Sequence, residues 1–147
     1  MEIIEIKENK KQFLPLLLLA DEQESMIDRY IDRGTMYVLG DNGVKCECVV
    51  TDEGKGILEI KNIATAPEYQ GKGYGKALID FVAAKYKGKY SILQVGTGDS
   101  PLTVPFYEKC GFARSHSIEN FFIDNYDHPI FEGGVQLTDM IYLQKKI

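Results

Sequence analysis

Three glycines at alternate positions, Gly71, Gly73 and Gly75, lie between a strand-like and a helix-like segment, and this turn constrains the fold more than any other feature. Residues 57–65 have the apolar, β-branched character of a strand, and residues 73–86 carry apolar side chains at helical spacing. Glycine permits backbone angles that let successive N–H groups point at one anion, and the helix that follows adds the positive end of its dipole. The sequence therefore predicts an α/β fold with a phosphate-binding turn.

This turn differs from two common phosphate-binding motifs. A P-loop would have Ser or Thr after the pair Gly75-Lys76, where Ala77 stands, and the dinucleotide fingerprint would have its third glycine three residues after Gly73 rather than two. A glycine-rich turn that binds no ligand is the alternative that the turn alone leaves open. A second motif is needed to assign the ligand.

The rest of the chain alternates between predicted strands and helices. Apolar periodicity predicts further strands over residues 1–7, 35–39, 44–51, 90–95, 112–118 and 139–143, and helices over residues 9–20, 21–33 and 101–109. Asp21 followed by Glu24 indicates a capping box for the second of these helices. The polar and aromatic segment 119–138 has the length of a functional insertion or lid.

Composition and charge indicate one acidic globular domain spanning residues 1–147. Lys and Arg number 17 against 22 Asp and Glu, a net charge of −5 that disfavours nucleic acid and favours a cationic ligand. Cys46 and Cys48 point the same way along a strand, so we expect free thiols and a cytoplasmic location. The apolar run 13–20 is too short to span a bilayer and lacks a cleavage site, which favours a buried helix over an export signal or a membrane contact.

Two motifs together resemble those of the GCN5-related N-acetyltransferase (GNAT) superfamily. Residues 70–75, Gln-Gly-Lys-Gly-Tyr-Gly, match its Gln/Arg-x-x-Gly-x-Gly/Ala signature, and residues 106–112, Phe-Tyr-Glu-Lys-Cys-Gly-Phe, resemble a second family motif downstream. The order of predicted elements is similar across nearly the whole chain. The resemblance implies a single GNAT-type domain whose twisted, mostly antiparallel sheet of about seven strands, with about four helices, splits between strands four and five.

The resemblance also implies acetyl-CoA as the co-substrate and assigns the positions that bind it. The fourth strand would pair its backbone with the acetyl and pantetheine amides, and the turn would wrap the pyrophosphate. Ser100 stands where many members have an Asn that touches the cofactor, and a helix-capping role is its alternative. The implied cofactor-binding residues are Ile63, Ala64, Thr65, Gln70, Gly71, Lys72, Gly73, Tyr74, Gly75, Lys76 and Ser100.

Tyr107 and Glu59 are the implied catalytic residues. Tyr107 matches the family tyrosine that hydrogen-bonds the departing CoA sulfur; since tyrosine titrates near pKa ~10 and a thiol near ~8.5, we expect partial proton donation in the transition state. The alternative is that Tyr107 is an aromatic residue of the core without a catalytic role. Many members have a base on the fifth strand, where Gln94 stands, whereas histone-modifying members have it at the position of Glu59. By period two Glu59 shares a strand face with Ile63, and a carboxylate paired with Lys61 is its alternative role.

The implied reaction is transfer of an acetyl group from acetyl-CoA to a primary amine by direct attack, without a covalent enzyme intermediate. Cys110 has no evident His partner and is not expected to be a nucleophile. The aromatic and acidic segment 119–138 favours a small-molecule amine as acceptor. A protein or peptide N-acetyltransferase and a catalytically inactive CoA-binding sensor are the alternatives. We expect no metal ion, no nucleic acid partner, and a monomer or homodimer.

Overall fold

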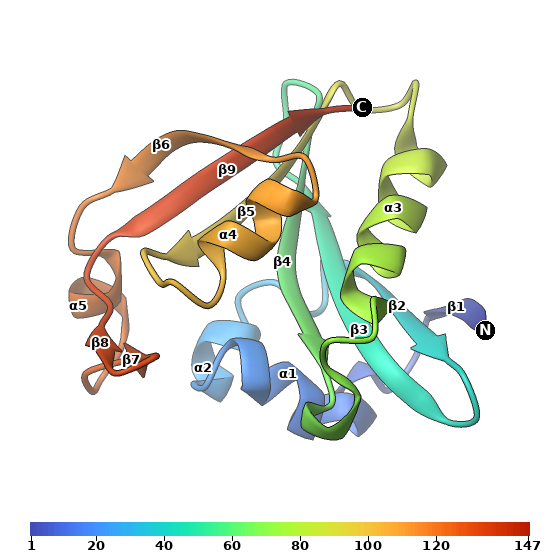
Figure 1. Ribbon diagram of the computed structural model, residues 1–147, viewed down its shortest axis with the longest axis horizontal. Helices are drawn as coiled ribbons and strands as arrows, with labels where there is room; N and C mark the ends of the chain where they lie inside the picture. Colours follow the sequence, from blue (N-terminus) through green and yellow to red (C-terminus); the bar gives the residue numbers. More distant parts are fainter.

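The computed structural model describes residues 1–147, and its central feature is a twisted seven-stranded sheet (Figure 1). Its strand order is β1-β2-β3-β4-β5-β9-β6, and all neighbours are antiparallel except β4 and β5, which are parallel. This arrangement confirms the expected class of fold. The strands are β1 (Glu2–Ile6), β2 (Thr35–Gly40), β3 (Val44–Asp52), β4 (Ile57–Thr65), β5 (Ile92–Gly98), β6 (Ala113–Ile118) and β9 (Met140–Lys146).

Helices cover both faces of the sheet because alternate strand residues are apolar on each side. In β2, Tyr37 packs in the large core under the helix that follows the glycine turn, whereas Met36 and Val38 pack in a smaller core under the N-terminal helices. None of the helices is long and apolar enough to cross a membrane. The helices are η1 (Lys10–Phe13), α1 (Leu14–Ala20), α2 (Glu24–Ile27), η2 (Pro67–Tyr69), α3 (Tyr74–Tyr86), α4 (Val104–Lys109) and α5 (Phe121–Asn125).

The sheet splits where β4 and β5 diverge. Their pairing runs only from Ile57 with Ile92 to Ile60 with Val95. Beyond these residues β4 stays paired with β3 and β5 with β9, so the facing edges of the two strands separate (Figure 1). An opening between strands four and five is therefore built into the sheet, as expected.

A β-bulge in β4 lies at the start of this opening. β3 pairs Val50 with Ile60 but the adjacent Val49 with Asn62, which leaves Lys61 as an extra residue. One extra residue reverses the alternation of side chains between the two faces of a strand. In the first half of β4 the even-numbered Leu58 and Ile60 therefore face the large core, whereas in the second half the odd-numbered Ile63 does.

Local structure departs from expectation near residues 21–33 and 119–138. The capping box is wrong: Gln23 occupies the N-cap of α2 without a side-chain hydrogen bond, and that helix ends at Ile27. The segment 119–138 contains α5 and a small hairpin of β7 (Phe131–Glu132) and β8 (Val135–Gln136), which pack as a third apolar cluster. This unit lies beyond the carboxyl end of β5, beside the sheet opening (Figure 1).

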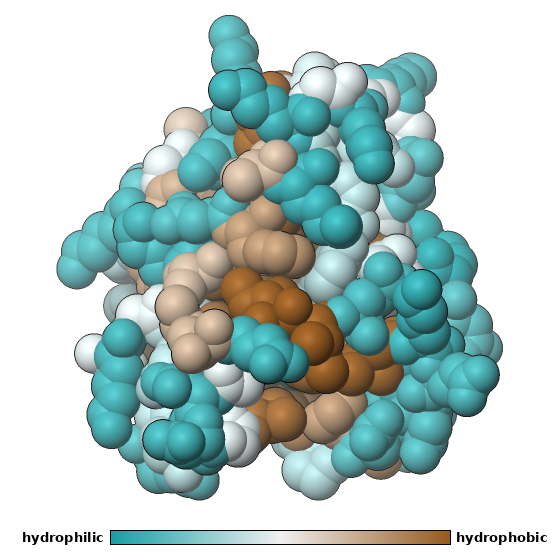
Figure 2. Space-filling view, turned by 90° about the vertical axis from the view of Figure 1, so that its right-hand side faces the viewer, coloured by the Kyte–Doolittle hydropathy of each residue, from teal (hydrophilic) through white to brown (hydrophobic).

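The opposite side of the molecule carries α3 and the edge strand β1. On this face, hydrophobic residues gather in a central area bordered by hydrophilic ones (Figure 2). Ile4 on β1 remains 47% exposed. This surface lies on the side of the molecule away from β7 and β8.

Candidate active site

A cavity of about 660 Å³ occupies the split between β4 and β5. Its walls come from the second half of β4, the glycine turn, the second half of β5, α4, the end of α1 and the segment 119–138. We call the end at the glycine turn the cofactor end, after the ligand that the sequence predicts there, and we call the end between α1 and the segment 119–138 the acceptor end. The two ends belong to one continuous space.

The glycine turn has the backbone conformation that its sequence predicts. Gly71 and Gly73 have φ values of 78° and 88°, in the left-handed region that favours glycine, and Gly73 is the N-cap of α3. A Cβ on Gly75 would lie 3.3 Å from the ring of Phe106. The Gln70 side chain donates to the Thr65 carbonyl at 3.1 Å, which ties the turn to the end of β4. The turn and the free α3 N-terminus therefore have the backbone arrangement that the predicted phosphate-binding role requires.

Three of the residues that were expected to bind the cofactor either lie outside the cavity or are paired with another side chain. Lys72 and Ser100 do not line the cavity, and Lys76 lines it but forms an ion pair with Asp80 at 2.7 Å. The buried Ser100 hydroxyl accepts the Leu102 N–H, closing the turn before α4, whose N-cap is Thr103 rather than Ser100. The other expected residues, Ile63 to Thr65, Gln70, Gly71 and Gly73 to Gly75, all line the cavity.

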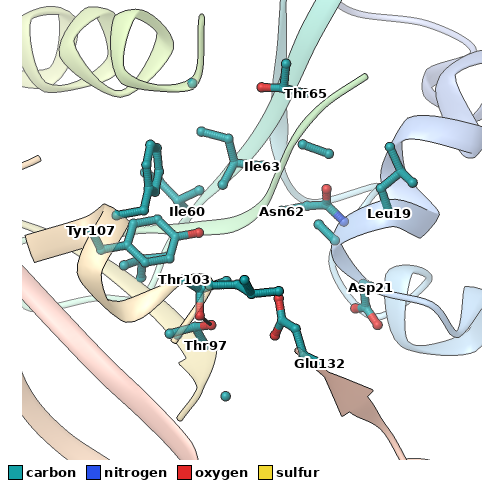
Figure 3. Close-up of a pocket in the computed structure, with 18 of the residues that line it drawn as sticks. Leu19, Asp21, Ile60, Asn62, Ile63, Thr65, Thr97, Thr103, Tyr107 and Glu132 are labelled. Atoms are coloured by element: carbon teal, nitrogen blue, oxygen red, sulfur yellow. Dashed lines mark hydrogen bonds between the residues drawn. The ribbon is translucent and has the colours of Figure 1, made fainter. Parts of the chain in front are cut away.

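Tyr107 presents its hydroxyl to the cavity from α4 (Figure 3). Its ring packs edge-on against Phe106 and Phe112, with ring centroids 5.2 Å and 5.9 Å away. Burial raises the pKa of Tyr107, and the negative charge of Glu132 raises it further. No protein group hydrogen-bonds its hydroxyl, so the group is free to contact a ligand.

Glu59 does not line the cavity, and the expectation that it shares a face with Ile63 is wrong. The bulge at Lys61 puts Ile63 against the large core under α3, whereas Glu59 lies on the other face. There the Glu59 carboxylate accepts a hydrogen bond from Gln94 Nε2 at 2.6 Å and pairs with Lys61 Nζ at 3.0 Å. This geometry corresponds to the alternative role, a carboxylate paired within the sheet.

Three other carboxylates line the acceptor end, namely Asp21, Glu22 and Glu132. Glu132, on β7, is half-buried and forms no ion pair or hydrogen bond with a protein side chain. Burial raises the pKa of Glu132, and the charge of Glu22 adds to the shift. Burial also raises the pKa of Asp21, against the opposing effect of its hydrogen bonds. The acceptor end is thus an acidic pocket.

Contacts between residues 21–23 and 126–128 close one side of this acidic pocket. Tyr126 donates its hydroxyl to Asp21 Oδ1 at 2.8 Å, and the backbone N–H of Asp127 donates to the Gln23 side chain at 3.1 Å. His128 contacts the Glu22 carboxylate at 2.8 Å, and Asp127 and Glu22 together raise the pKa of His128. We call this set of contacts the roof. It joins segments about a hundred residues apart in the sequence, so sequence patterns gave no signal for it.

Asn62 is a site residue that sequence reasoning missed. It is 2% exposed, lines the cavity from β4, and donates its Nδ2 to the Leu17 carbonyl and the Tyr30 hydroxyl, each at 3.0 Å. Its Oδ1 has no hydrogen-bond partner. A polar residue within an apolar strand was the available signal, because such a side chain requires partners when buried.

Comparisons with known proteins agree with this geometry. A family model described as an acetyltransferase (GNAT) domain matches residues 32–114. The N-acetyltransferase YvbK of Bacillus subtilis is 36% identical over 143 residues, which cover 93% of this chain and 90% of the relative. A GNAT family acetyltransferase from Elizabethkingia anophelis, solved with acetyl-CoA bound, has a TM-score of 0.92 at 36% identity and covers 99% of this chain and 97% of its own.

Two further solved structures have similar folds. An IAA acetyltransferase from Bacillus cereus has a TM-score of 0.89 at 35% identity, covering 99% of this chain and 100% of its own. A Bacillus subtilis acetyltransferase in complex with CoA has a TM-score of 0.88 at 32% identity, covering 99% and 98%. The chain belongs to the GNAT family of acetyltransferases. It is an N-acetyltransferase, an enzyme of the acyltransferase class.

Proposed function

We propose that residues 1–147 form one catalytic domain that transfers an acetyl group from acetyl-CoA to a primary amine of a small molecule, by direct attack in a ternary complex. The observation that carries this proposal is the single cavity in the sheet opening, with the glycine turn at one end and an acidic pocket at the other. One space can hold both reactants at once. The buried Cys110 does not line this cavity and burial raises the pKa of its thiol, which supports direct attack over an acetyl-cysteine intermediate.

Acetyl-CoA binds along β4 with its pyrophosphate on the glycine turn. The edge of β4 that faces the opening is released from β5 after Ile60, so the backbone of Ile63, Ala64 and Thr65 can pair with the amides of pantetheine. The two solved relatives that carry acetyl-CoA and CoA support this ligand. The cofactor-binding residues that line the cavity are Ile63, Ala64, Thr65, Gln70, Gly71, Gly73, Tyr74, Gly75 and Lys76.

Tyr107 serves as the hydrogen-bond donor to the departing sulfur. The neutral amine attacks the thioester carbonyl, a C–N bond forms, and the C–S bond breaks as negative charge moves to sulfur. Because the pKa of Tyr107 is raised, the hydroxyl stays protonated and available to the sulfur. Its fixed ring, packed between Phe106 and Phe112, holds the donor in place.

Glu132 replaces Glu59 as the group that takes the proton of the amine. An alkylammonium has a pKa near ~10, so it must lose a proton before attack. The raised pKa of Glu132 makes its carboxylate a stronger base than an exposed one, and it lines the same cavity as Tyr107. A carboxylate from β7 thus compensates for Gln94 at the fifth-strand position, which weighs against a sensor that has lost catalysis.

A small acceptor is favoured over a peptide because the roof covers the acceptor end. The hydrogen bonds from Tyr126 and Asp127 to residues 21 and 23 join two segments beside the acceptor end, an arrangement that favours a compact acceptor. A glucosamine 6-phosphate N-acetyltransferase of Trypanosoma brucei brucei is 32% identical over 81 residues, 54% of this chain and 52% of the relative. The carboxylates of the acceptor end would repel a phosphate, so glucosamine 6-phosphate is disfavoured as the acceptor here.

Free thiols at Cys46, Cys48 and Cys110 support a cytoplasmic setting for this protein.

Thiol release from acetyl-CoA in the presence of an amine panel tests this function. The panel contains alkyl amines, amino acids, glucosamine 6-phosphate and a short peptide, and Tyr107→Phe is assayed beside the natural chain. We expect release that depends on a small cationic amine and falls in the variant. Binding of acetyl-CoA without release from any amine would favour the sensor, and release with the peptide alone would favour the protein acetyltransferase.

A further inference from the structure

Three buried side-chain atoms form no hydrogen bond within the protein, and they belong to only two residues. They are Oδ1 of Asn62 on β4 and both carboxyl oxygens of Glu47 on the neighbouring strand β3. Glu47 is 0% exposed and Asn62 is 2% exposed. Because most buried polar groups are paired, two exceptions on neighbouring strands require a common explanation.

The register of the sheet brings these two side chains together. β3 pairs Glu47 with Ala64 and Val49 with Asn62, so Glu47 and Asn62 are diagonal neighbours on the face that α1 covers. Diagonal neighbours are about 7–8 Å apart, within reach of a long side chain. Figure 3 shows Nδ2 of Asn62 turned toward α1, whereas Oδ1 points along β4 toward Thr65. The unpaired oxygen of Asn62 thus points toward the part of β4 that pairs with Glu47.

Glu47 and Asn62 can bond to each other only if Glu47 carries a proton. An ionised carboxylate and an amide oxygen both accept hydrogen bonds, whereas a carboxylic acid has one O–H to donate. Asn62 cannot supply the donor, because its Nδ2 already donates to the Leu17 carbonyl and the Tyr30 hydroxyl, each at 3.0 Å. A proton on Glu47 satisfies Oδ1 and also removes a buried charge.

No positive charge pairs with Glu47. Lys45 lies two residues earlier on the same face of β3. Its Nζ donates to the Asn42 carbonyl at 3.0 Å and lies 3.7 Å from the centre of the Tyr69 ring, and it forms no ion pair. α1, which covers this face, contains no charged residue. Burial accordingly holds the pKa of Glu47 well above its usual range, and the backbone of Ala64 opposes this shift only in part.

The other titratable groups near Glu47 are thiols and phenols. Burial raises the pKa of each of them, and the charge of Glu47 is a further cause of the shift. They come from β3, from the segment after α2 and from α4, and they are Cys46, Cys48, Tyr30 and Tyr107. None of these groups supplies a positive charge, so the neutral acid is the form of Glu47 that this face of the sheet can bury.

We propose that Glu47 is a positioning residue of the acceptor end, whose carboxylic acid donates a hydrogen bond to Asn62 Oδ1 and so fixes the side chain that holds α1 and Tyr30 to β4. The Leu17 carbonyl that Asn62 contacts also accepts the backbone N–H of Asp21 at 3.1 Å, and Tyr30 donates to Asp21 Oδ2 at 3.1 Å. One buried proton thereby orients the end of α1 and the Asp21 carboxylate, which line the cavity. That this wall receives the amine rests on the proposed function.

Three variants separate the hydrogen bond from packing. Glu47→Gln keeps the shape of the side chain and an N–H donor for Asn62 but cannot ionise, whereas Glu47→Met has a similar size and no donor. Thr51→Val is the matched control, because Thr51 is another buried polar residue of β3 that lies outside the cavity and bonds to Glu53.

Infrared spectroscopy at neutral pH detects the proton, since a carboxylic acid and a carboxylate absorb at different frequencies. The difference spectrum between the natural chain and Glu47→Gln cancels every other carboxyl group. We expect it to contain the band of a hydrogen-bonded carboxylic acid, and we expect that band to move to the position of a free acid in Asn62→Leu.

Amide hydrogen exchange at residues 17–21 measures how firmly the end of α1 is held. Glu47→Met should speed this exchange about 2- to 10-fold, the range for one lost hydrogen bond, whereas Glu47→Gln and Thr51→Val should leave it unchanged. In thiol-release assays with butylamine, Glu47→Met should raise the KM for the amine, Glu47→Gln should restore it, and the KM for acetyl-CoA should stay constant.

Three results would overturn the inference. A carboxylate band for Glu47, or an acid band that Asn62→Leu leaves unmoved, would refute the hydrogen bond. Equal exchange at residues 17–21 in Glu47→Gln and Glu47→Met would refute the positioning role. The infrared comparison does not need Glu47→Met to fold, and neither it nor the exchange needs turnover. A protein that gives both expected results but releases no thiol with any amine would therefore contradict the proposed function alone.

Discussion

Replacing Tyr107 by Phe should separate catalysis from stability. The ring contacts with Phe106 and Phe112 remain in the variant, and the lost hydroxyl has no protein partner that would be left unpaired. We therefore expect the free energy of unfolding to stay within about 0.5 kcal/mol of the natural chain, as for a substitution that leaves no buried group unsatisfied.

The catalytic effect of this substitution should be large. A positioned general acid contributes about 10²- to 10⁴-fold to a rate, which corresponds to about 3 to 5 kcal/mol of transition-state stabilisation. Because the hydroxyl meets sulfur charge only as the C–S bond breaks, the loss should appear in kcat rather than in the affinity for acetyl-CoA.

Steady-state thiol release, thermal melting and acetyl-CoA calorimetry together measure these effects. Tyr142→Phe is the matched control, because Tyr142 is also buried but lies outside the cavity. A Tyr107→Phe enzyme that turns over within about threefold of the natural chain would refute the donor role, since even a weak general acid contributes more.

Three further predictions follow from the site. Glu132→Gln should lower kcat about 10²-fold or more and remove the rise of kcat through a pKa above the usual Glu range; an unchanged pH profile would leave solvent as the base. Contacts with Asp127 and Glu22 raise the pKa of His128, so the stabilising effect of its charged form is present at acid pH and is lost as pH rises through that raised pKa. The difference in melting temperature between the natural chain and His128→Gln should therefore shrink with rising pH. Gly73 and Gly88 both have a left-handed φ, so Gly73→Ala and Gly88→Ala should each cost about 1–2 kcal/mol of stability. Only Gly73→Ala should weaken acetyl-CoA binding in calorimetry. Equal weakening in both variants would contradict the proposed anion-binding role of the turn.

Much of the fold could be predicted because its signals are local. The hydrophobic periodicity of the strands, the left-handed glycines and the two spaced motifs each depend on residues a few positions apart, and all seven strands of the main sheet were expected. The apolar run likewise indicated a helix ending at Ala20, but of the residues of α1 only Leu17 is buried and Leu19 is 52% exposed, so the expected burial of this helix is wrong for most of its length.

The carboxylate that we propose as the base, Glu132, could not be predicted because its position depends on contacts that are distant in the sequence. A single extra residue at Lys61 reverses the strand alternation and turns Glu59 away from Ile63, and no composition rule marks that position as a bulge. Glu132 lines the cavity from β7, and the nearby residues 126–128 contact residues 21–23, which lie about a hundred positions away in the sequence. Asp21, expected as a helix cap, instead accepts hydrogen bonds from Tyr30 and Tyr126 across the chain.

Initial rates measured over a matrix of acetyl-CoA and acceptor amine concentrations test the central claim most directly. If both reactants occupy the one cavity between β4 and β5 and the amine attacks the thioester directly, double-reciprocal plots should intersect. Parallel lines, together with an acetylated protein trapped in the absence of amine, would show a covalent enzyme intermediate and contradict the account.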